Sequence, residues 1–178
     1  ISARDLKEAI ASLLPFVGES AVQVSREGIQ IKAIDPGNIC LTSVGILPEA
    51  FNIFDFSDEK RVVGIDLTQF WNVISMADPG DETSFKLDEK RLGIQVGSLS
   101  CEVGLLNPED LHAVPRIPDI ELETRLFVEV SRFKKAVKLM AKMGDQIFMG
   151  NDGDILYLEE CNINPIIDPI VVRISNSE

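Results

Sequence analysis

The stretch ARDLKEAI, residues 3–10, recurs in outline as GIDLTQFWNVI at residues 64–74 and as VEVSRFKKAV at residues 128–137. Each copy carries apolar residues at helical spacing. Each is followed by a turn and an apolar strand, and these strands are REGIQIKAI, EKRLGIQVG and DGDILYLEE. A pattern that returns along the chain is typical of a protein built from one supersecondary unit used several times. These copies therefore decide the fold class.

The unit predicted from the copies is βαβββ. In the first copy Val22, Val24, Ile29 and Ile31 alternate with polar residues, which is typical of strands with one buried face. The strands NICLTSVGIL, SLSCEVGLL and PIVVRIS would close the three units. RVVGI and RLFVEV would be the strands that precede the second and third helices. The prediction is an α+β fold of three βαβββ units.

Local signals place the turns and the helix starts. Gly28 and Gly153 stand in two of the predicted hairpins, where a positive φ favours glycine. Asp5, Asp66 and Ser131 are predicted helix N-caps, because a side-chain oxygen there accepts a free backbone N–H.

The connector after the second unit defines the domains. It runs over residues 107–124 and contains Pro108, Pro115 and Pro118, which exclude a regular helix. We predict a first domain of two units at residues 1–106 and the first half of a second domain at residues 125–178. The apolar side chains of the connector would cover a domain surface or form part of a docking groove.

The charge of the chain is uneven. It has 29 acidic and 17 basic residues and a net charge of −12, yet SRFKKAVKLMAK, residues 131–142, holds five cations and no acid. The three cysteines lie far apart and His112 is the only histidine, so a structural zinc site is not expected. We expect the cysteines to be buried, reduced thiols. No predicted membrane span, signal peptide or catalytic constellation stands out, and we expect a cytosolic or nuclear protein without catalytic residues, metal or cofactor.

Two stretches resemble one protein family. GIQIKAIDPGNICL, Gly28–Leu41, and LLNPEDLHAVPRIPDIELE, Leu105–Glu123, are similar to a strand–turn–strand and to the interdomain connecting loop of the archaeal and eukaryotic sliding clamp, proliferating cell nuclear antigen (PCNA). The ordered set covers essentially the whole chain. The resemblance implies the DNA-clamp fold, a homotrimeric ring with sheets outside and helices lining a hole around duplex DNA. It implies a processivity factor that tethers replication and repair enzymes, not an enzyme.

The resemblance also assigns sites. Residues expected to face DNA, without reading its sequence, are Lys134, Lys135, Lys138, Lys142, Arg132, Lys7 and Arg4. The groove expected to bind short motifs of a DNA polymerase, clamp loader, ligase or nuclease comprises Ile34, Asn38, Ile39, Leu41, Leu111, Val114 and Ile117. The expected subunit interface comprises Cys101, Val103, Leu105, Ile170, Val172 and Ile174. No membrane contact is expected.

The chain departs from the family in two ways. The polar face of the second helix carries Thr68, Gln69, Asn72 and Ser75 where the family tends to have lysines. The chain also holds three units where the family has four, so that it would be truncated at its C-terminus; a natural truncation and an incomplete chain both fit. The alternative function is a clamp-fold adaptor, of checkpoint or viral processivity type, that binds partners without closing a ring.

Overall fold

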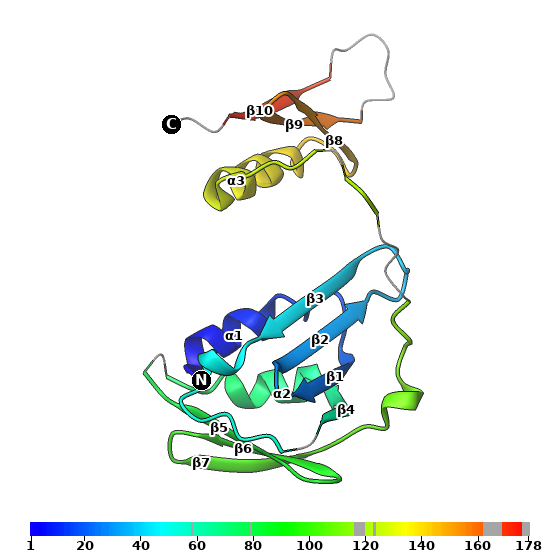
Figure 1. Ribbon diagram of the computed structural model, residues 1–178. Helices are drawn as coiled ribbons and strands as arrows, with labels where there is room; N and C mark the ends of the chain where they lie inside the picture. Colours follow the sequence, from blue (N-terminus) through cyan, green and yellow to red (C-terminus); the bar gives the residue numbers. More distant parts are fainter. Residues whose placement is uncertain (58, 79, 116–119, 123, 162–168, 176–178) are drawn as a thin grey trace. The chain divides into compact units, whose positions relative to one another are not determined.

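The computed structural model describes residues 1–178 except 58, 79, 116–119, 123, 162–168 and 176–178. The chain forms two compact units, Ile1–Ile117 and Pro118–Glu178, and each has a hydrophobic core of its own. Figure 1 shows the elements of both units along the chain. The division between the units falls inside the proline-rich connector.

The first unit contains two repeats, each with one helix followed by three strands, and in the second repeat a further strand precedes the helix. The first repeat comprises α1 (Ala3–Ala11), β1 (Glu19–Ser25), β2 (Gly28–Ile34) and β3 (Leu41–Ile46), followed by the short 3-10 helix η1 (Pro48–Ala50). The second comprises β4 (Lys60–Asp66), α2 (Leu67–Ile74), β5 (Thr83–Leu87), β6 (Arg91–Val96) and β7 (Leu99–Gly104). A second 3-10 helix, η2 (Pro108–Asp110), lies in the connector.

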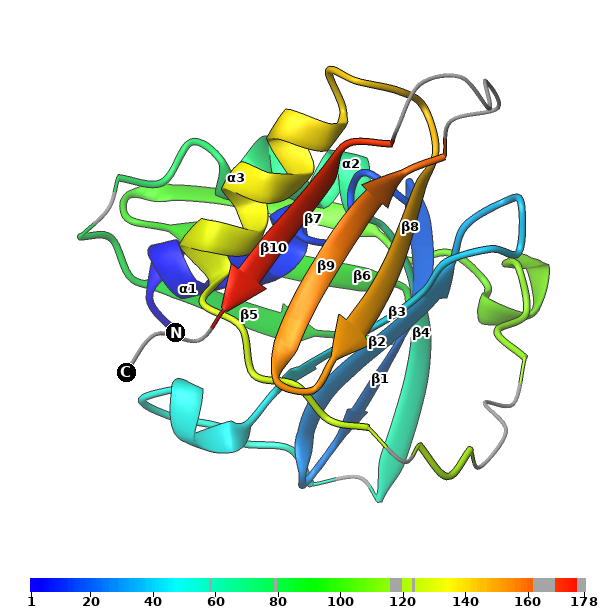
Figure 2. The ribbon, with the colours of Figure 1, turned by 90° about the horizontal axis from the view of Figure 1, so that it is seen from above.

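The first strand of the second repeat joins the sheet of the first repeat. One sheet has the order β3-β2-β1-β4 and the other β5-β6-β7. β4 runs antiparallel to β1, from the pair Glu19↔Asp66 to the pair Ser25↔Lys60. Figure 2 shows the two sheets and the helices α1 and α2, which contact each other. This exchange ties the two repeats into one domain.

Each helix buries the face that its sequence predicts. Leu6 and Ile10 on the first helix, Leu13 in the turn after it, and Leu67, Phe70 and Ile74 on the second helix are at most 7% exposed. They pack with both sheets into one core. The predicted N-cap Asp66 is confirmed, because its carboxylate accepts the N–H of Gln69 at 2.8 Å.

Two other predicted N-caps are wrong. α1 is capped by Ser2, whose hydroxyl accepts the N–H of Asp5 at 3.2 Å. Asp5 therefore lies in the first turn, where its carboxylate interacts favourably with the helix dipole. The third helix begins two residues earlier than predicted, with Glu129 as N-cap and Ser131 inside the helix. The positive φ predicted for Gly28 and Gly153 is confirmed, at 117° and 58°.

The second unit is a single repeat. It contains α3 (Val130–Met140), β8 (Ile147–Asp152), β9 (Ile155–Glu160) and β10 (Val171–Ser175), with the sheet order β10-β9-β8. α3 packs on β9 and β10 (Figure 1). The helix buries Ala136 and Met140. The strand predicted at RLFVEV is wrong, since its described residues 125–129 lead into α3 outside any strand. A strand requires a neighbour on which to form a ladder, as β4 has in β1.

Candidate functional site

The exposed lysines of the third repeat form one surface, which we call the basic face: Lys134, Lys135, Lys138 and Lys142. Helical spacing sets the first three opposite the buried Ala136 and Met140. Lys142 lies just beyond the end of α3, in a turn whose backbone N–H donates to Leu139 O at 3.0 Å. Among the described residues no ion pair involves these four lysines. Their charges are therefore available to a polyanion.

The other three cations expected to contact DNA are already engaged. Arg4 pairs with Glu8 at 3.3 Å. Lys7 is half-buried, and its Nζ donates to the carbonyl oxygens of Ser75, the C-cap of α2, at 3.0 Å, and of Ala77, in the turn after the helix. Arg132 pairs with Glu129 at 2.9 Å and donates to the carbonyl oxygen of Ser175, also at 2.9 Å. Lys7 thus links α1 to the end of α2, and Arg132 links α3 to β10.

Charge also gathers around Glu129, the N-cap of α3. The Ser131 hydroxyl donates to its carboxylate, and this hydrogen bond is the largest cause of a pKa below the ordinary glutamate value. Arg132 and Lys135 lower the pKa further. Glu129 therefore stays ionised and neutralises part of the cation cluster at the start of the helix, which leaves the positive charge concentrated farther along the basic face.

A tight turn joins β2 to β3 and holds one expected groove residue outward. The carboxylate of Asp35 accepts the backbone N–H groups of Gly37, Ile39 and Cys40 at 3.1, 2.8 and 2.6 Å. These bonds, that of Cys40 first, lower the pKa of Asp35 below its ordinary value. Asn38 has a φ of 55°, and Ile39 is 90% exposed. The turn therefore presents an apolar side chain to solvent on a fixed backbone.

The connector reaches this turn. The Nε2–H of His112 donates to Asn38 Oδ1 at 3.0 Å. Upstream, Leu106 forms an antiparallel bridge with Gly64 of β4, with N–O distances of 2.9 and 3.1 Å. A Cβ at Gly64 would lie 2.9 Å from Leu111 Cδ1, so glycine admits the connector at close range. The connector therefore meets the first unit at two places, β4 and the β2–β3 turn.

The remaining groove residues differ in exposure. Ile34 is buried and lies opposite Leu41, which is half-buried, at the ends of β2 and β3. Leu111 and Val114 of the connector are half-buried. Ile117 lies outside the described residues. The arrangement is an exposed isoleucine beside a partly apolar rim made by strand ends and connector.

The strands expected at the subunit interface are both sheet edges. β7 ends one sheet and β10 another. Their expected interface side chains point mainly inward, because Cys101, Val103 and Leu105 pack on the first core and Val172 and Ile174 on the second. Ile170, by contrast, is 42% exposed. What these edges present outward is chiefly backbone N–H and C=O.

Sequence reasoning missed two features of this region. The bond between His112 and Asn38 joins residues 74 positions apart, and no local pattern predicts it. The turn at Asp35 had a signal, since Asp-Pro-Gly-Asn is typical of a turn in which a carboxylate bonds the following backbone.

No helix among the described residues is long and apolar enough to cross a membrane.

Comparisons with known proteins bear on the family and on the fold. The family model "Proliferating cell nuclear antigen, N-terminal domain" matches residues 2–103. Proteins named DNA polymerase sliding clamp are similar to the chain over 161 residues, at 35% identity in Methanococcoides burtonii and 36% in Methanosarcina mazei. These matches cover 89% of the chain but 65% of each relative, so the chain spans about two thirds of the length of its relatives.

A solved structure shares the fold. The PCNA of A. fulgidus, in a structure with the C-terminal region of FEN-1 bound, superposes with a TM-score of 0.88 at 24% identity. That match covers 98% of this chain and 70% of the other. A PCNA2–PCNA3 complex from Sulfolobus tokodaii matches with a TM-score of 0.76 at 18% identity. Because the family model matches more than half of the chain, the chain belongs to the proliferating cell nuclear antigen family of sliding clamps.

Proposed function

We propose that this chain is the larger part of a DNA sliding clamp, a processivity factor that surrounds duplex DNA and holds replication and repair enzymes on it. The observation that carries the proposal is the basic face of α3 in a chain whose net charge is −12. Overall acidity disfavours adhesion to nucleic acid, so contact with phosphate depends on local placement of cations. Flexible lysines attract phosphate without fixing a register on the bases, which suits sliding.

The chain would act by binding and not by catalysis. Its partners would insert short apolar motifs beside the β2–β3 turn, where Ile39 is exposed and His112 holds the connector. The bound FEN-1 segment of the A. fulgidus relative supports a peptide-binding role of this kind. An exposed isoleucine on a backbone fixed by Asp35 supplies an anchor at low entropic cost.

The full protein would be a ring of three copies joined edge to edge. β7 and β10 are unpaired sheet edges among the described residues, and such edges pair readily with another chain. Contact between two different edges is heterologous and closes into a ring when the rotation allows. The ring is favoured over the adaptor by the presence of both edges and the basic face in one chain.

The experiment compares two charge reversals of equal size. One variant carries Lys→Glu at Lys134, Lys135, Lys138 and Lys142, and the control carries Lys→Glu at four exposed lysines of the first unit, Lys32, Lys60, Lys86 and Lys90. Binding to a fluorescent duplex is measured by anisotropy from about 50 to 200 mM salt. The basic-face variant should lose binding and most of its salt dependence, since each phosphate contact contributes a slope of about 0.9.

The control reversal changes the net charge by the same amount and should retain most of the binding. Circular dichroism of both variants checks that the fold is intact. Equal losses in the two variants would mean that net charge alone governs binding, and an unaffected basic-face variant would remove α3 from the DNA interface. Either result would contradict the proposal.

A further inference from the structure

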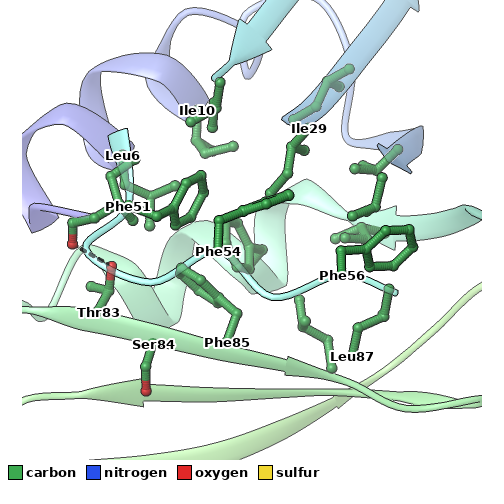
Figure 3. A pocket seen from close by; sticks show the side chains of 18 of the residues that line it. Leu6, Ile10, Ile29, Phe51, Phe54, Phe56, Thr83, Ser84, Phe85 and Leu87 are labelled. Atoms are coloured by element: carbon green, nitrogen blue, oxygen red, sulfur yellow. Dashed lines mark hydrogen bonds between the residues drawn. The ribbon is translucent and has the colours of Figure 1, made fainter. Parts of the chain in front are cut away.

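The sheet β5-β6-β7 has two edges, and the described chain engages them differently. At the β5 edge, Thr83 N donates to Ile1 O at 3.3 Å, and Ser2 forms an antiparallel bridge with Glu82. Figure 3 shows an apolar cavity beside this strand, with Phe85 among the side chains that line it. The β5 edge therefore lies against the first residues of the chain. No described residue pairs with the outer side of β7.

The outer side of β7 carries a single charge. Leu105 N donates to Lys90 O at 2.9 Å, and alternation along the ladder to β6 then leaves three positions facing away from β6, namely Ser100, Glu102 and Gly104. All three residues are exposed, and Glu102 is the one charged residue of the strand. Arg91 donates to its Oε2 at 2.7 Å. A carboxylate has two oxygens, so it can accept a second guanidinium.

The outer side of β10 offers the opposite charge. Glu160 N donates to Ile170 O at 3.0 Å, and alternation then leaves three positions facing away from β9, namely Val171, Arg173 and Ser175. Arg173 is exposed and is the one charged residue of this strand. Each edge strand thus holds one charge, at the central one of its three outward positions, and the two charges have opposite signs.

Further positive charge lies beside the β10 edge. A hollow of about 330 Å³ between α3 and β10 is lined by Lys135, Leu139 and Arg173 among others. Lys135 and Arg173 are both exposed, and no ion pair among the described residues includes either of them. Two β10 edges brought together would therefore concentrate positive charge that nothing on either edge neutralises.

The outward positions restrict how the two edges can pair. A shift of one residue would turn every side chain of a strand to the other face, so the possible registers differ by two. Every strand pair of the described sheets is antiparallel. In the antiparallel register that sets Glu102 opposite Arg173, Gly104 lies opposite Val171. A shift by two in either direction would leave both charges without a facing partner.

We propose that Glu102 of one copy and Arg173 of a second copy form a cross-strand ion pair that selects the register and the direction of the contact between β7 and β10. This inference rests on the edge-to-edge assembly proposed above and names the side chains that select it. An exposed ion pair adds little affinity, so Arg173→Ala leaves the association largely intact. Like charges that face each other oppose pairing, and the pair therefore acts by exclusion.

The excluded contacts are those between like edges. Two β10 strands in full antiparallel overlap would set Arg173 against Arg173, and two β7 strands would set Glu102 against Glu102. Both would be isologous contacts, which end at a dimer. The contact between unlike edges is heterologous and can continue around a ring. The two charges thus favour the contact that a ring requires.

The test traps the contact as a disulfide between two variants mixed in equal amounts. One carries Gly104→Cys, where no atom lies within 4 Å of an added Cβ, and the other carries Val171→Cys. Facing Cα atoms of a hydrogen-bonded antiparallel pair lie about 5.5 Å apart, which a disulfide spans. The matched control replaces Val171→Cys by Ser175→Cys. This position is as far from Arg173 along the strand, but it lies roughly 13 Å from Gly104 in the proposed register.

Intact mass spectrometry separates the mixed disulfide from those of like chains, and the parent chain, whose three cysteines are half-buried, gives the background. Arg173→Glu in the Val171→Cys chain should slow the cross-linking about tenfold, because two carboxylates then face each other. Adding Glu102→Arg to the Gly104→Cys chain should restore most of the rate. Lys86→Glu, an equal charge change at an exposed residue of β5, should leave the rate unchanged.

The outcomes distinguish the ion pair from the assembly on which it rests. A cross-link whose rate ignores Arg173→Glu would overturn the ion pair and leave the edge contact in place. Equal trapping of the Val171→Cys and Ser175→Cys chains would overturn the register. No disulfide above the parent background would overturn both the ion pair and the edge-to-edge assembly. The DNA titration of the basic face is unaffected by any of these results.

Discussion

His112 and Asn38, 74 positions apart, are joined by a hydrogen bond of 3.0 Å between Nε2 and Oδ1. Asn38 has a φ of 55°, in the left-handed region, so the backbone that holds its side chain has little conformational freedom. The connector is thereby fixed to the turn that exposes Ile39, and the rim of the proposed groove exists before a partner arrives. A preformed rim lowers the entropic cost of binding.

His112→Ala should release the connector from the turn. We expect about fivefold to tenfold weaker binding of a clamp-binding peptide, consistent with the loss of one exposed hydrogen bond and some preorganisation. Fluorescence titration with a labelled peptide measures this. His112→Gln, which keeps a donor, is the control and should lose less. Equal affinity in all three proteins would show that the bond does not shape the groove.

Asp35 makes the same turn sensitive to acid. Its pKa lies below the ordinary value of 3.8 because Cys40, Ile39 and Gly37 donate to the ionised carboxylate. Because its pKa is lowered in the folded state, the Asp35 carboxylate contributes fully to stability above about pH 4. This contribution is lost as the pH falls through the lowered pKa. NMR shifts of the Ile39 and Cys40 amides should therefore titrate below pH 3.8. In Asp35→Asn this titration should be absent, and its persistence would point to another group.

Lys7 gives a prediction about stability that separates it from the basic face. Its ammonium group donates to the carbonyl oxygens of Ser75, the C-cap of α2, and of Ala77, in the turn that follows. Lys7→Met should lower the free energy of unfolding by about 1 kcal/mol, since a half-buried charged hydrogen bond is lost. Urea unfolding measures this. Arg4→Met, which removes only an exposed ion pair, is the control, and Lys138→Met should reduce DNA affinity more than Lys7→Met does.

The sequence predicted what depends on local pattern. Helical spacing located the buried faces of all three helices, and the turn glycines Gly28 and Gly153 have the positive φ expected of them. N-caps were less certain, because Ser2 and Asp5 are both good capping residues and only the path of the chain before the helix decides between them. The bonds of Lys7 to Ser75 and of Arg132 to Ser175 span 68 and 43 positions. Such bonds follow from tertiary packing, which no local pattern encodes.

Gly64 governs how closely the connector approaches β4. A Cβ there would lie 2.8 Å from Leu106 O and 2.9 Å from Leu111 Cδ1. Gly64→Ala should cost about 1–3 kcal/mol of stability and loosen the connector, since backbone must move to accept the methyl group. Limited proteolysis within residues 107–124 measures the loosening. Gly45→Ala, where no atom lies within 4 Å of the added carbon, is the matched control and should be cleaved like the parent chain.

The edge of β10 can be tested through its backbone, because its side chains serve the core. Val172 packs on the second core, so a charge at this position would unfold the unit and confuse any measurement of assembly. Glu160 N donates to Ile170 O at 3.0 Å, and alternation then makes Val172 and Ile174 bond β9 while Arg173 directs its N–H outward. Arg173→Pro removes that outward donor and leaves the ladder to β9 intact.

If copies of the chain join β7 to β10, Arg173→Pro should shift the particle mass toward the 19.6 kDa monomer in light scattering, and Arg173→Ala, which keeps the N–H, should not. The corresponding change in β7 is Glu102→Pro, whose N–H also points outward, because Leu105 N donates to Lys90 O at 2.9 Å and sets the alternation. It should have the same effect, since each contact uses one edge of each kind. An oligomeric parent chain whose mass survives both proline substitutions would show that the copies associate through other surfaces.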